Sequence, residues 1–180
     1  MILNRSRRFP LETVLLASLA FLVSACGSDE EDGSTATERP PMPVLMPASA
    51  ATKQVLALTA GYQSWSKFPE NQSLKPSPTH KNMQVISYYN DAVGGSMTSG
   101  SLPLPDGALI VKENWAKADD PGPMALTIMH KQGGDWYWCQ VTPDGQVFVE
   151  DGNALEGKNV AMCTNCHKSA ANDAVLTHTF

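Results

Sequence analysis

The runs Met124-Ala-Leu-Thr-Ile-Met-His130 and Trp136-Tyr-Trp-Cys-Gln-Val141, joined through Gly133-Gly134, decide the fold class. Both runs are rich in β-branched and aromatic side chains, a composition that is typical of strands. The glycine pair between them marks a tight connection. This stretch therefore predicts two neighbouring antiparallel strands.

Similar runs extend the pattern on both sides, at 84–89, 108–114 and 146–150. A Pro-Asp-Gly turn signal precedes each of the last two runs. Together these segments predict an antiparallel sheet of about five strands.

Two other segments have helical character. Residues 52–66 carry apolar side chains at the spacing of a short amphipathic helix, and the stretch from Val160 also becomes helical. Gly94, Gly95 and Gly100 predict a flexible connection within the sheet region. The expected fold class is α+β, mainly antiparallel β, with flanking helices and a C-terminal helix.

The N-terminal region reads as a signal peptide covering residues 1–25. Three arginines precede an apolar run, Leu15 to Val23, which is too short to cross a bilayer comfortably. The run ends in Val-Ser-Ala-Cys26, which resembles the lipobox of bacterial lipoproteins. The resemblance implies cleavage before Cys26 and lipidation of that residue. Ordinary secretion, with an unmodified Cys26, is the alternative.

Residues 26–50 contain four consecutive acidic side chains and four prolines, with few large apolar residues. Such a composition buries too little apolar surface to offset chain entropy, so we expect a disordered acidic, proline-rich tether. Residues 51–180 then form one domain of common size. The chain carries a formal net charge of −5, which argues against nucleic acid as a partner.

The chemistry of the chain is indicated by Cys163-Thr-Asn-Cys166-His167. This spacing matches the attachment pattern of c-type haem, in which both thiols form thioethers and the histidine ligates the iron. A zinc or redox Cys-x-x-Cys is the alternative, but a zinc site needs two further ligands nearby. One covalent haem c is therefore predicted on the C-terminal helix. Cys139, in its apolar run, is expected to be a buried, inert thiol.

The sixth coordination position of the iron decides between electron transfer and ligand binding. No methionine follows His167, so a sixth ligand would have to come from upstream. The upstream candidates lack a diagnostic context; they are Met83, Met97, Met124, Met129, His80 and His130. His178 reads as a surface or packing residue. We therefore expect a five-coordinate iron with an open distal face.

Three features together resemble the cytochrome P-460 family, which includes the cytochromes c′-beta. They are the run Pro105 to Glu113, with its Asp-Gly-x-x-x-Val-Lys-Glu pattern, the run Gly134 to Trp138, and the C-terminal haem motif. The resemblance covers most of residues 60–180. It implies a mostly antiparallel β fold, a homodimer and a five-coordinate haem.

In the enzymes of that family a lysine is covalently bonded to a porphyrin meso carbon, and the matching position here is Lys112. The strand pattern supports a special role for this residue, because Ala108, Ile110 and Lys112 share one face. A lysine on an apolar face is costly unless it is paired, exposed or chemically used. The alternative is a lysine at a strand end that extends to water.

The resemblance implies oxidation of hydroxylamine, by way of nitric oxide, with electrons passed to an external acceptor. A carboxylate near the distal face would help to remove protons, and general-base geometry decides which one. Glu156 is the first choice, with Glu113 and Glu150 as rivals. An apolar distal wall supplied by Phe68 or Phe148 would instead favour nitric oxide binding.

Three functions are therefore weighed for this chain. The first is a haem oxidoreductase acting on hydroxylamine; the second is a non-enzymatic, c′-beta-like nitric oxide or gas-binding protein; the third is a plain electron-transfer cytochrome. The expected location is the periplasm or cell envelope, lipid-anchored and at the outer membrane. The expected partners are the small nitrogenous substrate or nitric oxide, a redox protein and the membrane through the lipid anchor.

Overall fold

The computed structural model describes residues 42–180. The predicted signal peptide, Cys26 and most of the predicted tether lie outside the described residues. Within 42–180, no helix has both the length and the apolar character needed to cross a membrane.

The elements follow one another in the order β1 Val44–Pro47, α1 Ala50–Leu58, η1 Tyr62–Ser64, β2 Ser66–Lys67, β3 Lys75–Ser77, η2 Pro78–His80, β4 Met83–Tyr89, α2 Asp91–Ser99, β5 Leu109–Trp115, β6 Ala125–Gln132, β7 Asp135–Val141, β8 Gln146–Glu150, β9 Asn153–Ala154, β10 Glu156–Gly157 and α3 Ala161–His167. The η elements are single 3-10 turns.

The ten strands form one antiparallel sheet with a backbone order of β1-β8-β7-β6-β5-β4-β2. The short strands β3, β9 and β10 pair with β4, β8 and β7, respectively. The predicted α+β class with a mainly antiparallel sheet is confirmed. The five predicted strands correspond to β4 to β8, and the prediction of about five was too low because five short strands were missed.

The missed strands have two to four residues each. They are held by backbone pairing at the margins of the sheet, so their side chains need no alternating pattern. β1 is an example: Val44 and Met46 are exposed, yet the strand pairs with β8. The folded domain therefore begins before the predicted boundary at residue 51, and the last part of the predicted tether is a strand.

A helix, α2, stands where the glycines predicted a flexible connection. The Asn90 side chain caps its N-terminus by accepting from the Val93 N–H, and Gly100 ends it in the left-handed conformation. Gly94 also packs closely, because a Cβ there would lie 3.4 Å from the Tyr89 ring. Caps and tight packing thus outweigh the low helix propensity of glycine.

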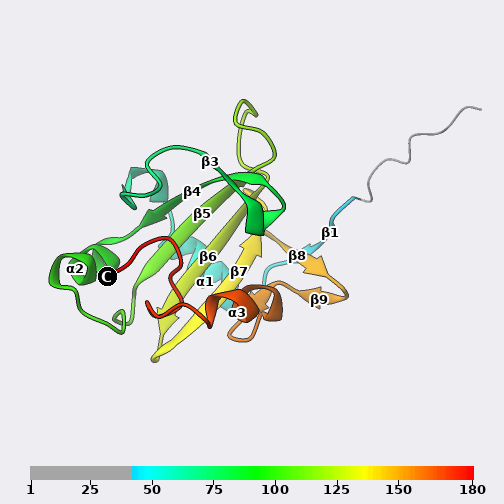
Figure 1. Cartoon of the computed structure of the whole chain (residues 1–180). Helices are drawn as coiled ribbons and strands as arrows, with labels where there is room; N and C mark the ends of the chain where they lie inside the picture. The colour runs from blue at the N-terminus through cyan, green and yellow to red at the C-terminus, as the bar shows by residue number, and fades with distance from the viewer. Residues whose placement is uncertain (1–41) are drawn as a thin grey trace, which may run out of the picture. The chain divides into compact units, whose positions relative to one another are not determined.

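The sheet separates two apolar cores. Val55 of α1 and Tyr62 of η1 pack with one face, together with Val111 and Ile128. The other core joins Ile110 and Trp138 of the sheet to Cys163 of α3 and Val93 of α2; Figure 1 shows α3 in front of the sheet and α1 behind it. The face that carries α3 is the one on which the predicted site residues meet.

Candidate functional site

The three residues of the haem motif lie on α3, which packs on the sheet. Cys163 is buried in the second core, Cys166 is exposed, and His167 is half-buried. All three line one cavity of about 240 Å³. The two thiols are three residues apart on a helix, so they project from the same side of it.

A polar row on the sheet forms the floor of this cavity. Lys112 on β5 is directly opposite Thr127 on β6, and Thr127 is directly opposite Gln140 on β7. All three side chains line the cavity, together with Asn114, whose Nδ2 donates to Thr127 Oγ1 at 3.0 Å. The fold thus brings Lys112 to the same cavity as Cys163, Cys166 and His167, although these three residues come much later in the chain.

The walls of the cavity include residues of η2, β8, α3 and the C-terminal segment. The turn η2 contributes His80, and Glu150 stands at the end of β8. Met162 of α3 and Leu176 of the C-terminal segment are 42% and 55% exposed although both line the cavity. Apolar side chains exposed beside a cavity are typical of a surface that a ligand covers.

The amine of Lys112 is the unusual charge in this cavity. Among the described residues, no side chain forms a hydrogen bond or an ion pair with Lys112 Nζ. Burial lowers the Lys112 pKa to about 8, so the neutral amine is far more accessible near physiological pH than in an ordinary lysine. A neutral amine is a nucleophile, which an ordinary surface lysine is not.

His167 has the geometry of a metal ligand. Its Nδ1–H donates to the carbonyl oxygen of Ala174 at 2.7 Å, which leaves Nε2 with a free lone pair. In most metal-bound histidines, the ring nitrogen that does not bind the metal donates a hydrogen bond, and this bond orients the ring. Burial lowers the His167 pKa and so favours the neutral, ligating form. Trp138 packs edge-on against the imidazole ring.

Two of the upstream candidates for the sixth ligand reach the cavity. His80 and Met83 line it, whereas Met97, Met124, Met129 and His130 do not. The His80 Nδ1 hydrogen bonds with Ser77 Oγ at 2.7 Å. Burial, with added effects of the charges on Lys112 and His167, lowers the His80 pKa to about 4. His80 is therefore a neutral imidazole, and sequence reasoning had no means to favour it over the other candidates.

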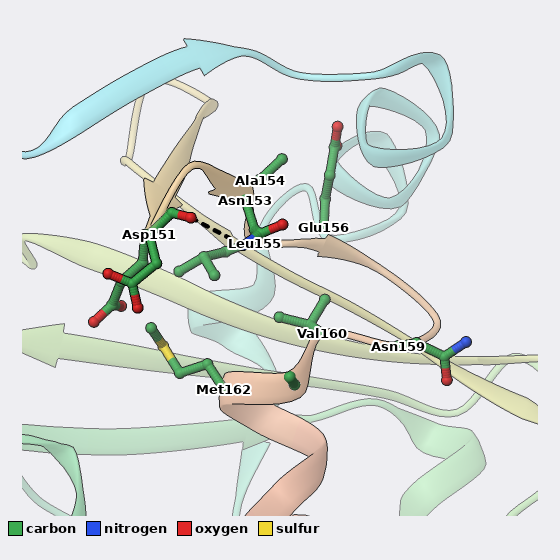
Figure 2. Close-up of a pocket in the computed structure, with 10 residues that line it drawn as sticks. Asp151, Asn153, Ala154, Leu155, Glu156, Asn159, Val160 and Met162 are labelled. Carbon is green, nitrogen blue, oxygen red and sulfur yellow. Dashed lines mark hydrogen bonds between the residues drawn. The ribbon is translucent and has the colours of Figure 1, made fainter.

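Glu156, the predicted proton acceptor, is not brought to this cavity. Its carboxylate accepts hydrogen bonds from Ser49 N at 3.2 Å, from Ser49 Oγ at 2.9 Å and from Thr52 Oγ1. Figure 2 shows Glu156 pointing towards α1 and away from Met162, at the rim of a neighbouring groove of about 570 Å³. The structure places this carboxylate outside the cavity, because β10 pairs with β7 and the side chain hydrogen bonds with the start of α1.

The rival carboxylates have different positions. Glu113 is 5% exposed and accepts from Tyr62 Oη at 2.8 Å and Trp115 Nε1 at 2.9 Å, in the core on the opposite face of β5 from Lys112. Glu150 lines both the haem-motif cavity and the neighbouring groove. Of the three predicted carboxylates, Glu150 is therefore the one that lines the same cavity as Lys112 and His167.

The remaining predicted residues lie away from the cavity lining. Phe68 is fully buried in the second core, where Phe148 also packs, and neither lines the cavity. Cys139 is fully buried in the first core, and burial raises its thiol pKa to about 12. The expectation that this thiol is buried is confirmed. His178 hydrogen bonds with Glu70 at 2.9 Å and stacks with Phe68, as a packing residue would.

The donor set fits a covalently attached haem. Two thiols on one helical turn, an adjacent imidazole with free Nε2 and exposed apolar side chains around a cavity are the groups that haem c requires. Among residues 42–180, no group of three or more His, Cys, Asp or Glu side chains is arranged to hold a metal ion by itself. Comparison with family models, curated proteins and solved structures finds no significant match to the chain.

Proposed function

We propose that the chain is a mono-haem c-type cytochrome that oxidises hydroxylamine. Cys163 and Cys166 would hold the porphyrin through thioethers, and His167 would ligate the iron through Nε2. One observation carries this proposal: Lys112 from the middle of the sheet lines the same cavity as the haem motif. That is the arrangement which the resemblance to the cytochrome P-460 family leads one to expect.

A haem held by Cys163, Cys166 and His167 would supply the redox chemistry that moves electrons from a nitrogen substrate to an external redox protein. Oxidation of hydroxylamine to nitric oxide releases three electrons and three protons, so the site needs proton acceptors. His80 is neutral and Glu150 carries a carboxylate, and both line the cavity. These two residues replace Glu156 as candidates for proton removal.

Lys112 would bond to a meso carbon of the porphyrin through its amine nitrogen. Forming the carbon–nitrogen bond removes one hydrogen from the amine and one from the carbon, a two-electron oxidation. A peroxide supplied during maturation would take up these electrons and protons and be reduced to water. The lowered pKa of Lys112 supports the proposal, because the bond requires the neutral amine.

Peptide mapping of the mature holoprotein tests the attachment. We expect haem on the peptide containing Cys163 and Cys166, and the same haem on a second peptide containing Lys112. The variant K112R keeps a positive charge but should lose the second attachment, the red-shifted ferrous Soret band and turnover of hydroxylamine with an artificial acceptor. K117R, in the loop after β5, is the matched control and should retain all three.

Each contrary result would change the functional assignment. Haem held by Cys163 and Cys166 with an unmodified Lys112 would move the assignment to a nitric oxide or gas-binding cytochrome of the c′-beta kind. Mature protein without covalent haem would refute the proposal altogether.

A second candidate function, plain electron transfer, is favoured by His80 and Met83 in the cavity lining. His80 of η2 and Met83 of β4 are both residue types that would serve as a sixth ligand of a haem bound in this cavity. A high-spin ferric spectrum in the wild type supports the open site. A low-spin spectrum that becomes high-spin in H80Q or in M83L identifies the ligand and supports electron transfer instead.

Export, lipidation of Cys26 and a periplasmic, outer-membrane location remain part of the proposal, as does a homodimer. Haem c attachment takes place outside the cytoplasm, so the signal-peptide prediction and the haem motif agree. Labelling with a radioactive fatty acid, lost in C26A, would test the anchor.

A further inference from the structure

The carbonyl group that orients His167 belongs to an unusual backbone segment. Asp173 and Ala174 both adopt left-handed conformations, with φ of 49° and 67°, although neither is glycine. Such conformations are energetically unfavourable for residues other than glycine. The segment therefore persists only because other contacts determine it, and the Ala174 carbonyl that it presents accepts the His167 Nδ1–H.

Asp173 supplies those contacts. Its carboxylate accepts from Lys131 Nζ at 2.8 and 3.0 Å and from the Leu104 backbone N–H at 2.8 Å. Its backbone carbonyl accepts from Trp136 Nε1 at 2.8 Å. The segment is thereby tied to β6, to β7 and to the chain before β5.

The ion pair between Lys131 and Asp173 is buried, with side chains 6% and 15% exposed. The ammonium of Lys131 also lies 5.1 Å from the centre of the Trp136 ring. Breaking a buried pair by removing one partner leaves an uncompensated charge, so such a pair holds its geometry firmly. Exposed ion pairs on this molecule, such as Lys158–Asp135, have no comparable constraint.

We propose that Asp173 is a positioning residue for the proximal histidine. It acts through Ala174: the buried carboxylate fixes the left-handed segment, and the segment aims its carbonyl at His167 Nδ1. A hydrogen bond at Nδ1 increases the donor strength of the opposite nitrogen and so tunes the metal. The inference rests on the proposed haem attachment and deepens it.

The test uses the holoprotein and two measurements, the iron–histidine stretching frequency and the midpoint potential. An Asp173 that only stabilised the fold would leave both values unchanged. D173N keeps the shape of the side chain but removes its charge. We expect a lower iron–histidine stretching frequency in the ferrous resonance Raman spectrum and a more positive midpoint potential, with haem still attached. D135N removes the partner of an exposed ion pair and is the matched control; both values should equal those of the wild type.

Holoprotein of D173N with wild-type stretching frequency and potential would overturn the inference. If D173N does not accumulate, W136F decides, because it removes the indole N–H that donates to the Asp173 carbonyl at 2.8 Å and to Asp173 Oδ1 at 3.3 Å, without stranding a buried charge. A smaller shift in the same direction supports the inference, and wild-type values overturn it. A wild-type protein without haem would instead refute the proposed function, before any variant is compared.

Discussion

The indole of Trp138 meets the imidazole of His167 edge to face, with ring centroids 4.9 Å apart and planes at 68°. Trp138 is 3% exposed and lies directly opposite Met129 in the sheet. The histidine is therefore held from two directions, by the indole and by the Ala174 carbonyl. Its orientation is therefore set by the fold itself.

The first prediction concerns Trp138. Replacing a buried tryptophan by leucine removes packing and should lower the free energy of unfolding by about 2–4 kcal/mol. Because the imidazole would lose one of its two supports, the electron paramagnetic resonance spectrum of the ferric haem in W138L should broaden. Urea unfolding and the spectrum measure the two effects.

W115F is a suitable control for W138L. Trp115 donates to Glu113, whose carboxylate lies on the opposite face of the sheet from α3. This variant should lose stability without altering the haem spectrum. A W138L spectrum as sharp as that of the wild type would show that the indole has no part in orienting His167.

The second prediction is a pH dependence that arises from His80. Burial lowers the folded-state pKa to about 4, whereas the unfolded chain has the ordinary value of 6.5. The unfolded state therefore binds more protons between these values, and the folded state loses stability as the pH falls from 6.5 towards 4. Relative to H80Q, which does not titrate, the wild type should lose about 1–3 kcal/mol over this interval.

Urea unfolding of both proteins at pH 7.5 and pH 4.5 measures this difference, and contributions from all other groups cancel in the comparison. Equal differences at the two pH values would mean that His80 is solvated and does not face the cavity as a neutral imidazole.

The third prediction counts thiols. In a soluble form that begins after Cys26, three cysteines remain: Cys139, Cys163 and Cys166. Two of these would be thioethers, and burial keeps the pKa of Cys139 far above neutrality. A thiol reagent at pH 8 should find no reactive thiol in the native holoprotein and one after denaturation. More than one thiol after denaturation would show that the motif has not bonded to haem.

The sequence was most informative where a pattern is long and local. The strands β4 to β8 could be predicted from runs of β-branched and aromatic residues, and the helix α3 from the helical character of the stretch after Val160. Strand pairing that depends on the backbone, as in β1, leaves no such pattern. The helix α2 was hidden because its glycines are compensated by caps and by the packing of Tyr89.

The candidate site was harder to predict, because its residues become neighbours only through the alignment of the strands and the packing of loops. Lys112 was found through resemblance, but Thr127 and Gln140 become its neighbours only once the strands are aligned. His80 lies on a turn that carries no signal of its own, and tertiary packing brings it to the cavity. Glu156 was chosen for its closeness to Cys163 in the chain, which says nothing about the direction of a side chain on a paired strand.

The fourth prediction distinguishes the role of Glu156 from that of Glu150. Glu156 accepts several hydrogen bonds at the start of α1, so E156Q should lower the free energy of unfolding by about 1–3 kcal/mol. It should leave the haem spectrum and hydroxylamine turnover unchanged, because its carboxylate lies outside the cavity.

E150Q should show the converse: little change in stability, since Glu150 makes one exposed ion pair at 3.5 Å, but slower turnover. General acid–base groups typically contribute about 100-fold or more to rate, so a loss of at least tenfold is expected if Glu150 accepts a proton. Turnover that falls in E156Q and stays normal in E150Q would restore the assignment made from the sequence and would mean that the cavity changes shape when haem is attached.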